Sequence, residues 1–170
     1  LVINIVDGAP IGRYVTANIV DSDASTRTTS LVIVLDRSGS MAWDLEGDNS
    51  GSSNFNADQV RMDIAKEALS SMFDSFDNLG NVNIKFVDFS STVNESQWYE
   101  DDKGAANNYL DGVTPGGGTN YDDAINATMS GYAPPVADTT LVYFISDGVF
   151  NLLCKVVCFL KASFNSFCDI

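Results

Sequence analysis

The segment Asp36-Arg37-Ser38-Gly39-Ser40 carries one carboxylate and two hydroxyls at alternate positions, directly after the apolar run Leu31–Leu35. Side chains alternate along an extended chain, so residues at this spacing can face one side. Carboxylates and hydroxyls are hard oxygen donors, which suit Mg²⁺, Ca²⁺ or Mn²⁺ better than zinc or copper. Because only one of these donors is charged, a cation held there would keep an open position and need a carboxylate from elsewhere.

The elements that must position these donors begin with buried strands. Continuous apolar runs are typical of strands covered on both faces of a parallel sheet, and the chain has such runs at Leu31–Leu35 and Leu141–Ile145. A further strand is predicted at Val82–Phe89. A short antiparallel strand is predicted around Trp98-Tyr99. Helices are predicted between these strands. The alternation predicts an α/β fold with a doubly wound, mainly parallel, Rossmann-like sheet.

The helices are predicted from apolar periodicity and from their end signals. One helix follows a polar loop at Trp43–Asn56, carries an apolar stripe from Val60 to Phe76, and ends at Gly80. A second is predicted at Asp101–Leu110. A third follows the glycine-rich loop that ends in Thr119. Each lies between two predicted strands, as a doubly wound sheet requires.

The predicted strands bring a set of oxygen donors to one edge. In an open α/β sheet, ligands sit beyond the carboxyl ends of the strands. Two of the buried strands lead into a carboxylate, Asp36 in one case and Asp147 in the other, and Thr119 lies between them in the chain. The order is therefore D-x-S-x-S, then Thr after glycines, then Asp after a buried strand.

This ordered set resembles the metal-ion-dependent adhesion site of von Willebrand factor type A domains. The resemblance covers about residues 30–148 and implies a domain that binds Mg²⁺, with Ca²⁺ or Mn²⁺ as alternatives. It implies that Ser38 and Ser40 ligate the metal directly and that Thr119 does so directly or through water. It implies that Asp36 and Asp147 act largely through waters and hydrogen bonds. Mg²⁺ suits this arrangement because it usually keeps several waters.

Each of these residues also has a purely structural interpretation. The two aspartates and two serines could be turn residues after strands. Thr119 with Asp122 three positions on could cap a helix. Arg37 is expected to face solvent. Acidic residues at 44, 46 and 48 resemble part of a calcium loop, but the loop lacks the required glycine and glutamate, so solvated acids are expected there.

Composition excludes several classes of function. The net charge is -14, with only nine Lys plus Arg, which argues against a nucleic-acid partner. No stretch reaches transmembrane length, so no membrane insertion is expected. Residues 1–150 contain neither His nor Cys, so they hold no nucleophile–base pair of the Ser–His or Cys–His kind. The chain is therefore not expected to be an enzyme.

The resemblance implies a divalent-cation-dependent adhesion module whose metal accepts an acidic group of a protein or glycan ligand. The alternative is an intracellular type A module that scaffolds an ATPase or a metal chelatase. A phosphatase-like hydrolase with Asp36 as nucleophile is disfavoured, because a serine, Ser38, stands where the second catalytic acid would be expected.

The two ends of the chain differ from its middle. Residues 1–20 are predicted to form β structure around a turn, as the end of a preceding β-sandwich-like repeat, and residues 21–30 a linker. The segment 4–10 resembles junctions in large bacterial RTX-type surface adhesins, which implies a secreted or cell-surface protein exported by type I secretion. Residues 31–150 would form a type A domain that is incomplete after its fourth strand.

Residues 151–170 form an atypical apolar tail. This tail contains all three cysteines of the chain, Cys154, Cys158 and Cys168. Two explanations stay open: a frameshifted end that is foreign to the rest, or a genuine core helix, since the apolar residues follow helical spacing. Zinc binding by these cysteines is not expected, because the chain has no histidine and a structural zinc site needs four ligands.

Overall fold

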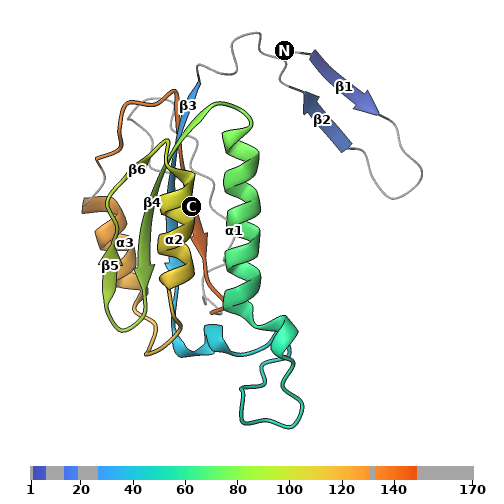
Figure 1. The fold of residues 1–170 in the computed structure, drawn as a ribbon, viewed down its shortest axis with the longest axis vertical. Helices are drawn as coiled ribbons and strands as arrows, with labels where there is room; N and C mark the ends of the chain where they lie inside the picture. Colours follow the sequence, from blue (N-terminus) through green and yellow to red (C-terminus); the bar gives the residue numbers. More distant parts are fainter. Residues whose placement is uncertain (1, 7–13, 19–26, 131–132, 149–170) are drawn as a thin grey trace, which may run out of the picture.

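The computed structural model describes residues 2–6, 14–18, 27–130 and 133–148 (Figure 1). Its main body is a five-stranded sheet in the order β5-β4-β3-β7, with β6 also paired to β4. The central strand β3 pairs in parallel with β4 and with β7, while β5 and β6 pair antiparallel with β4. The strands are β3 (Thr28–Asp36), β4 (Asn81–Phe89), β5 (Val93–Glu95), β6 (Tyr99–Glu100) and β7 (Thr139–Ile145).

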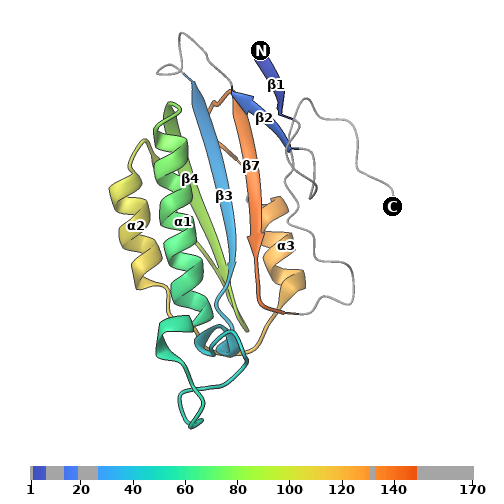
Figure 2. The same cartoon turned by 90° about the vertical axis from the view of Figure 1, so that its right-hand side faces the viewer.

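Helices cover both faces of this sheet. Helices α1 (Arg61–Asp77) and α2 (Lys103–Gly112) lie on one face, and α3 (Tyr121–Ser130) lies on the other (Figure 2). None of the helices in the described ranges is long and apolar enough to cross a lipid bilayer. The predicted doubly wound α/β fold with a mainly parallel sheet is therefore confirmed.

The central strand shows why the chain needs a continuous apolar run. Leu31, Ile33 and Leu35 pack into the cluster that includes residues of α1 and α2. Val32 and Val34 point to the opposite face and pack with the α3 side. All five side chains are at most 2% exposed. Burial on both faces explains why the segment Leu31–Leu35 has no polar residue before the strand reaches Asp36.

Aromatic rings fill the space between β4 and the helices that cover it. The Phe86 ring meets Phe73 of α1 edge-on, with ring centroids 6.0 Å apart, and stacks on Tyr109 of α2 at 5.0 Å. Tyr99 of β6 meets the same ring at 6.4 Å. Phe86 thereby ties both helices and the short strand to the centre of the sheet, which fixes the scaffold beneath the carboxyl edge.

The predicted element boundaries differ from the observed ones in ways that have local causes. The strand β3 begins at Thr28, before the apolar run, because Thr28 pairs with Asn81. The helix α1 begins later than the apolar stripe suggests, since Asn56 caps a separate 3-10 helix at Ala57–Gln59. The antiparallel strand predicted around Trp98-Tyr99 is β6, and β5 precedes it.

The first described residues form a separate two-stranded antiparallel sheet. Strand β1 (Val2–Val6) pairs with β2 (Tyr14–Asn18), as the alternation in this segment predicts. That this pair ends a β-sandwich-like repeat stays a prediction. The predicted turn at 7–10, most of the predicted linker and the apolar tail at 151–170 lie outside the described residues.

Candidate functional site

The carboxyl ends of β3 and β7 meet at one edge of the sheet (Figure 2). The two strands are parallel neighbours, and their pairing runs up to Leu35 and Ile145. Asp36 ends the first strand, and Asp147 follows the second after one intervening residue. Parallel pairing thus delivers two carboxylates, far apart in the sequence, to the same edge.

Asp36 connects the loops that leave these two strands. Its side chain is fully buried. One carboxylate oxygen accepts the backbone N–H of Ser38 at 2.7 Å, and the other accepts the hydroxyl of Ser146 at 2.6 Å. The Ser146 oxygen is also 3.0 Å from the backbone nitrogen of Gly148 and 2.9 Å from the Tyr121 hydroxyl. Since its proton is committed to Asp36, Ser146 accepts from both.

The other predicted donors lie beside Asp36 in the same loops. The Ser40 hydroxyl donates to Oδ1 of Asp147 at 3.1 Å, and the Ser38 hydroxyl oxygen is 3.2 Å from that of Ser40. Because Ser40 donates to Asp147, Ser38 is the donor to Ser40. The structure thus brings four of the five predicted residues together; we call Asp36, Ser38, Ser40 and Asp147 the oxygen cluster.

The glycine-rich loop packs against the same segment. The Gly117 carbonyl accepts the N–H of Gly39 at 2.9 Å, and the N–H of Gly116 donates to the Arg37 carbonyl at 2.7 Å. Gly117 needs its positive φ of 84° for this turn. The loop leads to Thr119, whose exposed hydroxyl has no hydrogen-bond partner within the described ranges. Thr119 is therefore near the motif but not part of the oxygen cluster.

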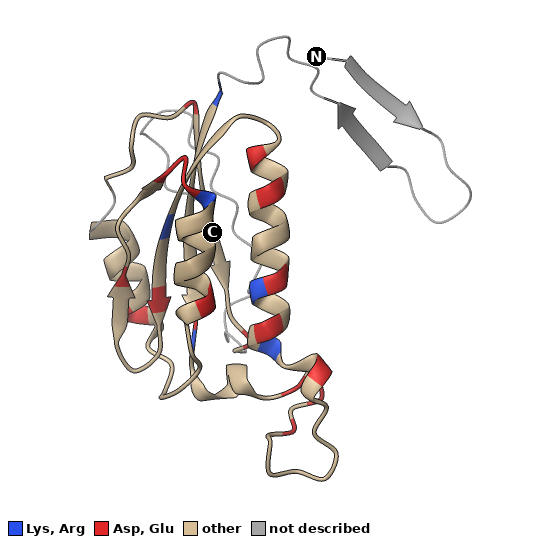
Figure 3. Ribbon diagram, in the orientation of Figure 1, with Lys and Arg blue, Asp and Glu red and all other residues tan. Residues whose placement is uncertain are grey.

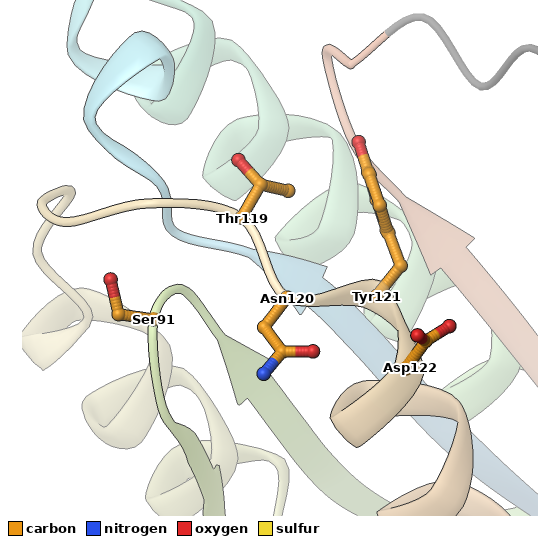
Figure 4. Close-up of a pocket in the computed structure, with 5 residues that line it drawn as sticks. All are labelled: Ser91, Thr119, Asn120, Tyr121 and Asp122. Carbon is orange, nitrogen blue, oxygen red and sulfur yellow. The ribbon is translucent and has the colours of Figure 1, made fainter.

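The cap of α3 differs from the predicted one. Thr119 and Asn120 point to opposite sides of the loop (Figure 4). Asn120, rather than Thr119, caps the helix: its Oδ1 accepts the N–H of Asp123 at 3.1 Å, and its amide donates to the Asp123 carboxylate at 2.6 Å. This cap leaves the Thr119 hydroxyl available. An open pocket of about 470 Å³ adjoins it, lined by Ser91, Thr119, Asn120, Tyr121 and Asp122.

The oxygen cluster fits a hard divalent cation in donor chemistry and in spacing. Within the described ranges no group of three or more His, Cys, Asp or Glu side chains could hold a metal ion, whereas the oxygen cluster offers two hydroxyls beside two carboxylates. The 3.2 Å between the Ser38 and Ser40 hydroxyl oxygens is close to the spacing of adjacent ligands around octahedral Mg²⁺, about 2.9 Å. Ser38 and Ser40 are the residues that would hold the ion, with the two carboxylates behind them.

Arg37 does not face solvent as expected. Its Nε donates to Oδ1 of Asp88, with 2.5 Å between the two atoms. Asp88 is buried at the end of β4 and also accepts from the Asn94 amide at 3.0 Å and from the Tyr109 hydroxyl at 2.5 Å. Burial, and then the hydrogen bond to Asp88, raise the pKa of Tyr109. This buried group anchors the motif to the sheet, and no pattern in the sequence pointed to it.

Asp44 is likewise not a solvated acid. It is buried at 1% exposure, and its carboxylate accepts the backbone N–H groups of Asp48 at 2.8 Å and Asn56 at 2.9 Å. The hydrogen bond from Asn56 is the main reason that the pKa of Asp44 is lowered. Asp44 therefore closes the loop that precedes α1, which is a structural role.

A basic side chain also reaches the oxygen cluster. Nη1 of Arg61, the first residue of α1, forms an ion pair with Oδ2 of Asp147. The side chains are 21% and 11% exposed, so the pair is largely shielded from solvent. No pattern in the sequence pointed to this contact, because the two residues are 86 positions apart.

Replacing Gly148 with alanine should strain the segment that carries Asp147. A Cβ at this position would lie 1.8 Å from the Tyr121 hydroxyl oxygen. The Tyr121 ring cannot easily move, because it packs against Phe89 at 5.5 Å and Phe144 at 6.1 Å. We expect the free energy of unfolding to fall by about 1–3 kcal/mol, measured by urea denaturation.

Gly112→Ala is the matched control for this change. An added Cβ there meets nothing within 4 Å, and the residue ends α2, so alanine should be neutral or slightly stabilising. Equal stability of the two variants would show that the segment after β7 adapts without cost.

Comparisons with known proteins agree with this architecture. The family model for the von Willebrand factor type A domain matches residues 31–149. The PilB minor pilin from Streptococcus sanguinis is similar in structure, with a TM-score of 0.60 and 23% identity over 75% of this chain and 31% of the pilin chain. A point mutant of the same pilin matches with a TM-score of 0.60 and 22% identity, covering 75% of this chain and 32% of that one.

A weaker structural likeness is to BatB from Bacteroides thetaiotaomicron, with a TM-score of 0.46 and 21% identity over 63% of this chain and 47% of that chain. No curated protein sequence matches the chain. The chain spans about a third of the pilin chains, and at these identities the likeness concerns the fold alone. The family model, which covers most of the chain, is decisive: the chain belongs to the von Willebrand factor type A domain family, whose members are protein-interaction modules.

Proposed function

We propose that this chain is a divalent-cation-dependent adhesion module with no catalytic step, in which the oxygen cluster binds Mg²⁺, Ca²⁺ or Mn²⁺. The observation that carries the proposal is the hydrogen-bonded chain from Ser38 through Ser40 to Asp147, at oxygen separations of 3.2 and 3.1 Å. Two segments that lie 107 residues apart in the sequence supply these oxygens, and the hydrogen bonds between them hold the oxygens close together at the end of the sheet. Thr119 joins as a further donor, directly or through water.

In this proposal the two serines bind the ion, and the two aspartates hold the serines in position. Ser38 and Ser40 offer neutral oxygens, so a bound cation keeps a net positive charge at its open position and can accept a carboxylate from a protein or glycan ligand. Asp36 fixes the backbone at Ser38 and the hydroxyl of Ser146. Asp147 orients Ser40. These two carboxylates keep the donors in position when no ligand is present.

The charge of the whole chain makes this binding depend on the cation. The net charge is -14, and acidic positions outnumber basic ones along the described ribbon (Figure 3). A carboxylate-bearing partner is therefore repelled by the protein surface unless a cation reverses the charge locally. The same composition suits a salty exterior, and one fold neighbour is a minor pilin. We accordingly propose a secreted or cell-surface location on a bacterium.

The proposal predicts cation-dependent capture of a carboxylate surface. The immobilised chain should retain carboxylated polystyrene beads in Mg²⁺, release them when a chelator is added, and retain them again when Mg²⁺ is restored in excess. Hydroxylated beads of the same size are the control and should not be retained, since a neutral surface offers the cation no charged ligand. Retention of carboxylated beads at full strength in chelator would overturn the proposal.

A further inference from the structure

The ion pair between Arg61 and Asp147 places a fixed positive charge beside the oxygen cluster. Arg61 is held at its backbone, where its N–H donates to the Trp43 carbonyl at 3.0 Å. Its guanidinium also lies against the loop before α1, since Nη2 is 3.6 Å from the point where a Cβ of Gly47 would be. The charge is thus anchored at both ends of the side chain.

The two oxygens of Asp147 have different partners. Oδ1 accepts from Ser40 inside the oxygen cluster, and Oδ2 contacts Arg61 outside it. The guanidinium is therefore only the width of one carboxylate away from the motif hydroxyls. With the two side chains 21% and 11% exposed, solvent and salt screen this charge only in part.

The position of Arg61 is not explained by the helix it begins. The first turn of a helix has a partial positive charge and favours acidic side chains, as Asp63 illustrates here. A cation at the first helical residue opposes that field. The position of Arg61 is better explained by the ion pair that its guanidinium forms with the carboxylate of Asp147.

The charged side chains around the oxygen cluster determine its net charge before and after a cation binds. Asp36 and Asp147 contribute two negative charges and Arg61 one positive charge, while Arg37 is neutralised by its own partner, Asp88. A divalent cation would bring this sum from -1 to +1, and one ligand carboxylate would bring it to zero. If Arg61 were neutral, the cation alone would neutralise the site.

We propose that Arg61 couples the cation to the acidic ligand, which is an inference that rests on the proposed function. Arg61 weakens the binding of the cation alone through repulsion, and it strengthens the binding of a carboxylate to the loaded site. The module therefore holds its cation tightly only when an acidic partner is present. Arg61 is a determinant of ligand charge that lies outside the residues of the motif.

The test is calorimetric titration of the 170-residue chain with Mn²⁺, with and without sodium acetate as the carboxylate probe. The Arg61→Gln variant should bind Mn²⁺ alone about tenfold more tightly than the unmodified chain. Its gain in Mn²⁺ affinity on adding acetate should shrink to near zero. Arg61→Lys keeps the charge and should behave like the unmodified chain in both titrations.

Lys66→Gln is the matched control for a lost charge on the same helix. Its Nζ contacts the backbone carbonyl of Asp111 at the surface, at 2.8 Å, and not the oxygen cluster. It should change Mn²⁺ affinity by less than about twofold, because solvent screens an exposed charge. A melting curve of each variant confirms folding, and Arg61→Met serves if Arg61→Gln does not fold.

The outcomes of these titrations distinguish a failure of the inference about Arg61 from a failure of the proposed metal site. If Arg61→Gln binds Mn²⁺ as weakly as the unmodified chain or more weakly, Arg61 only positions Asp147, and the coupling is overturned while the metal site stands. If neither the unmodified chain nor any folded variant binds Mn²⁺, the proposed function fails, and the inference fails with it.

Discussion

Replacing Ser38 and Ser40 together with alanine should abolish Mn²⁺ binding to this chain. The two hydroxyls are the neutral donors at the centre of the oxygen cluster, 3.2 Å apart. Without them only Asp36 and Asp147 remain, and Asp36 is already committed to the N–H of Ser38 and the hydroxyl of Ser146. We expect calorimetry to detect no heat of Mn²⁺ binding in the double variant.

The loss should not follow from unfolding. A neutral hydrogen bond contributes about 1 kcal/mol, so the double variant should keep most of its stability. Ser75→Ala with Ser130→Ala is the matched control, because each of these hydroxyls only bonds a backbone carbonyl of its own helix, Ser71 in one case and Asn126 in the other. Mn²⁺ binding of normal strength in the Ser38/Ser40 variant would show that another group of residues holds the cation.

The fold could be predicted because its central strands are buried on both faces. Leu31–Leu35 has no polar residue, since one side of β3 meets α1 and α2 and the other meets α3. Parallel strands in turn require helical crossovers. The apolar stripe after Val60 predicted one of these helices, and the glycine-rich loop marked the start of another. If the two strands are parallel neighbours, Asp36 and Asp147 must lie close together at the carboxyl ends of the strands, as they do.

The partners of the charged residues could not be predicted in the same way. Arg37 meets Asp88 only because β3 and β4 pair in a register that brings Leu35 opposite Asp88. Arg61 meets Asp147 only because α1 begins beside the end of β7. Such contacts depend on the complete arrangement of the elements, whereas periodicity describes one element at a time.

Two local features were accessible in principle. Ser146 stands directly before Asp147, just after β7, where a hydroxyl is well placed to reach the neighbouring carboxylate. The strand β7 itself is only partly buried, because it lies at the edge of the described sheet and not inside it as its apolar run predicted. Asn120 with Asp123 three positions on is a capping pair of the same kind as Thr119 with Asp122. The pairs differ by one residue in register, and the structure selects Asn120, whose N–H is held by the carbonyl of Ser90 at 2.8 Å.

Asp88→Ala should produce the largest loss of stability among single substitutions near the site. Asp88 is 2% exposed and accepts hydrogen bonds from Arg37, Asn94 and Tyr109. Its removal leaves a guanidinium, an amide and a phenol without their common acceptor. Breaking one partner of a buried ion pair costs about 3–5 kcal/mol, and we expect a decrease in the free energy of unfolding in this range.

Urea denaturation of Asp88→Ala and Asp88→Asn separates the charge from the space that the side chain fills. Asparagine keeps the shape and one acceptor but removes the negative charge, so its loss should be smaller than that of alanine. Mn²⁺ affinity should fall in both variants, because Arg37 lies inside the motif and its unpaired charge adds to that of Arg61 beside the oxygen cluster. A loss below about 1 kcal/mol for Asp88→Ala would show that solvent reaches these partners, so that the Arg37–Asp88 pair does not anchor the motif.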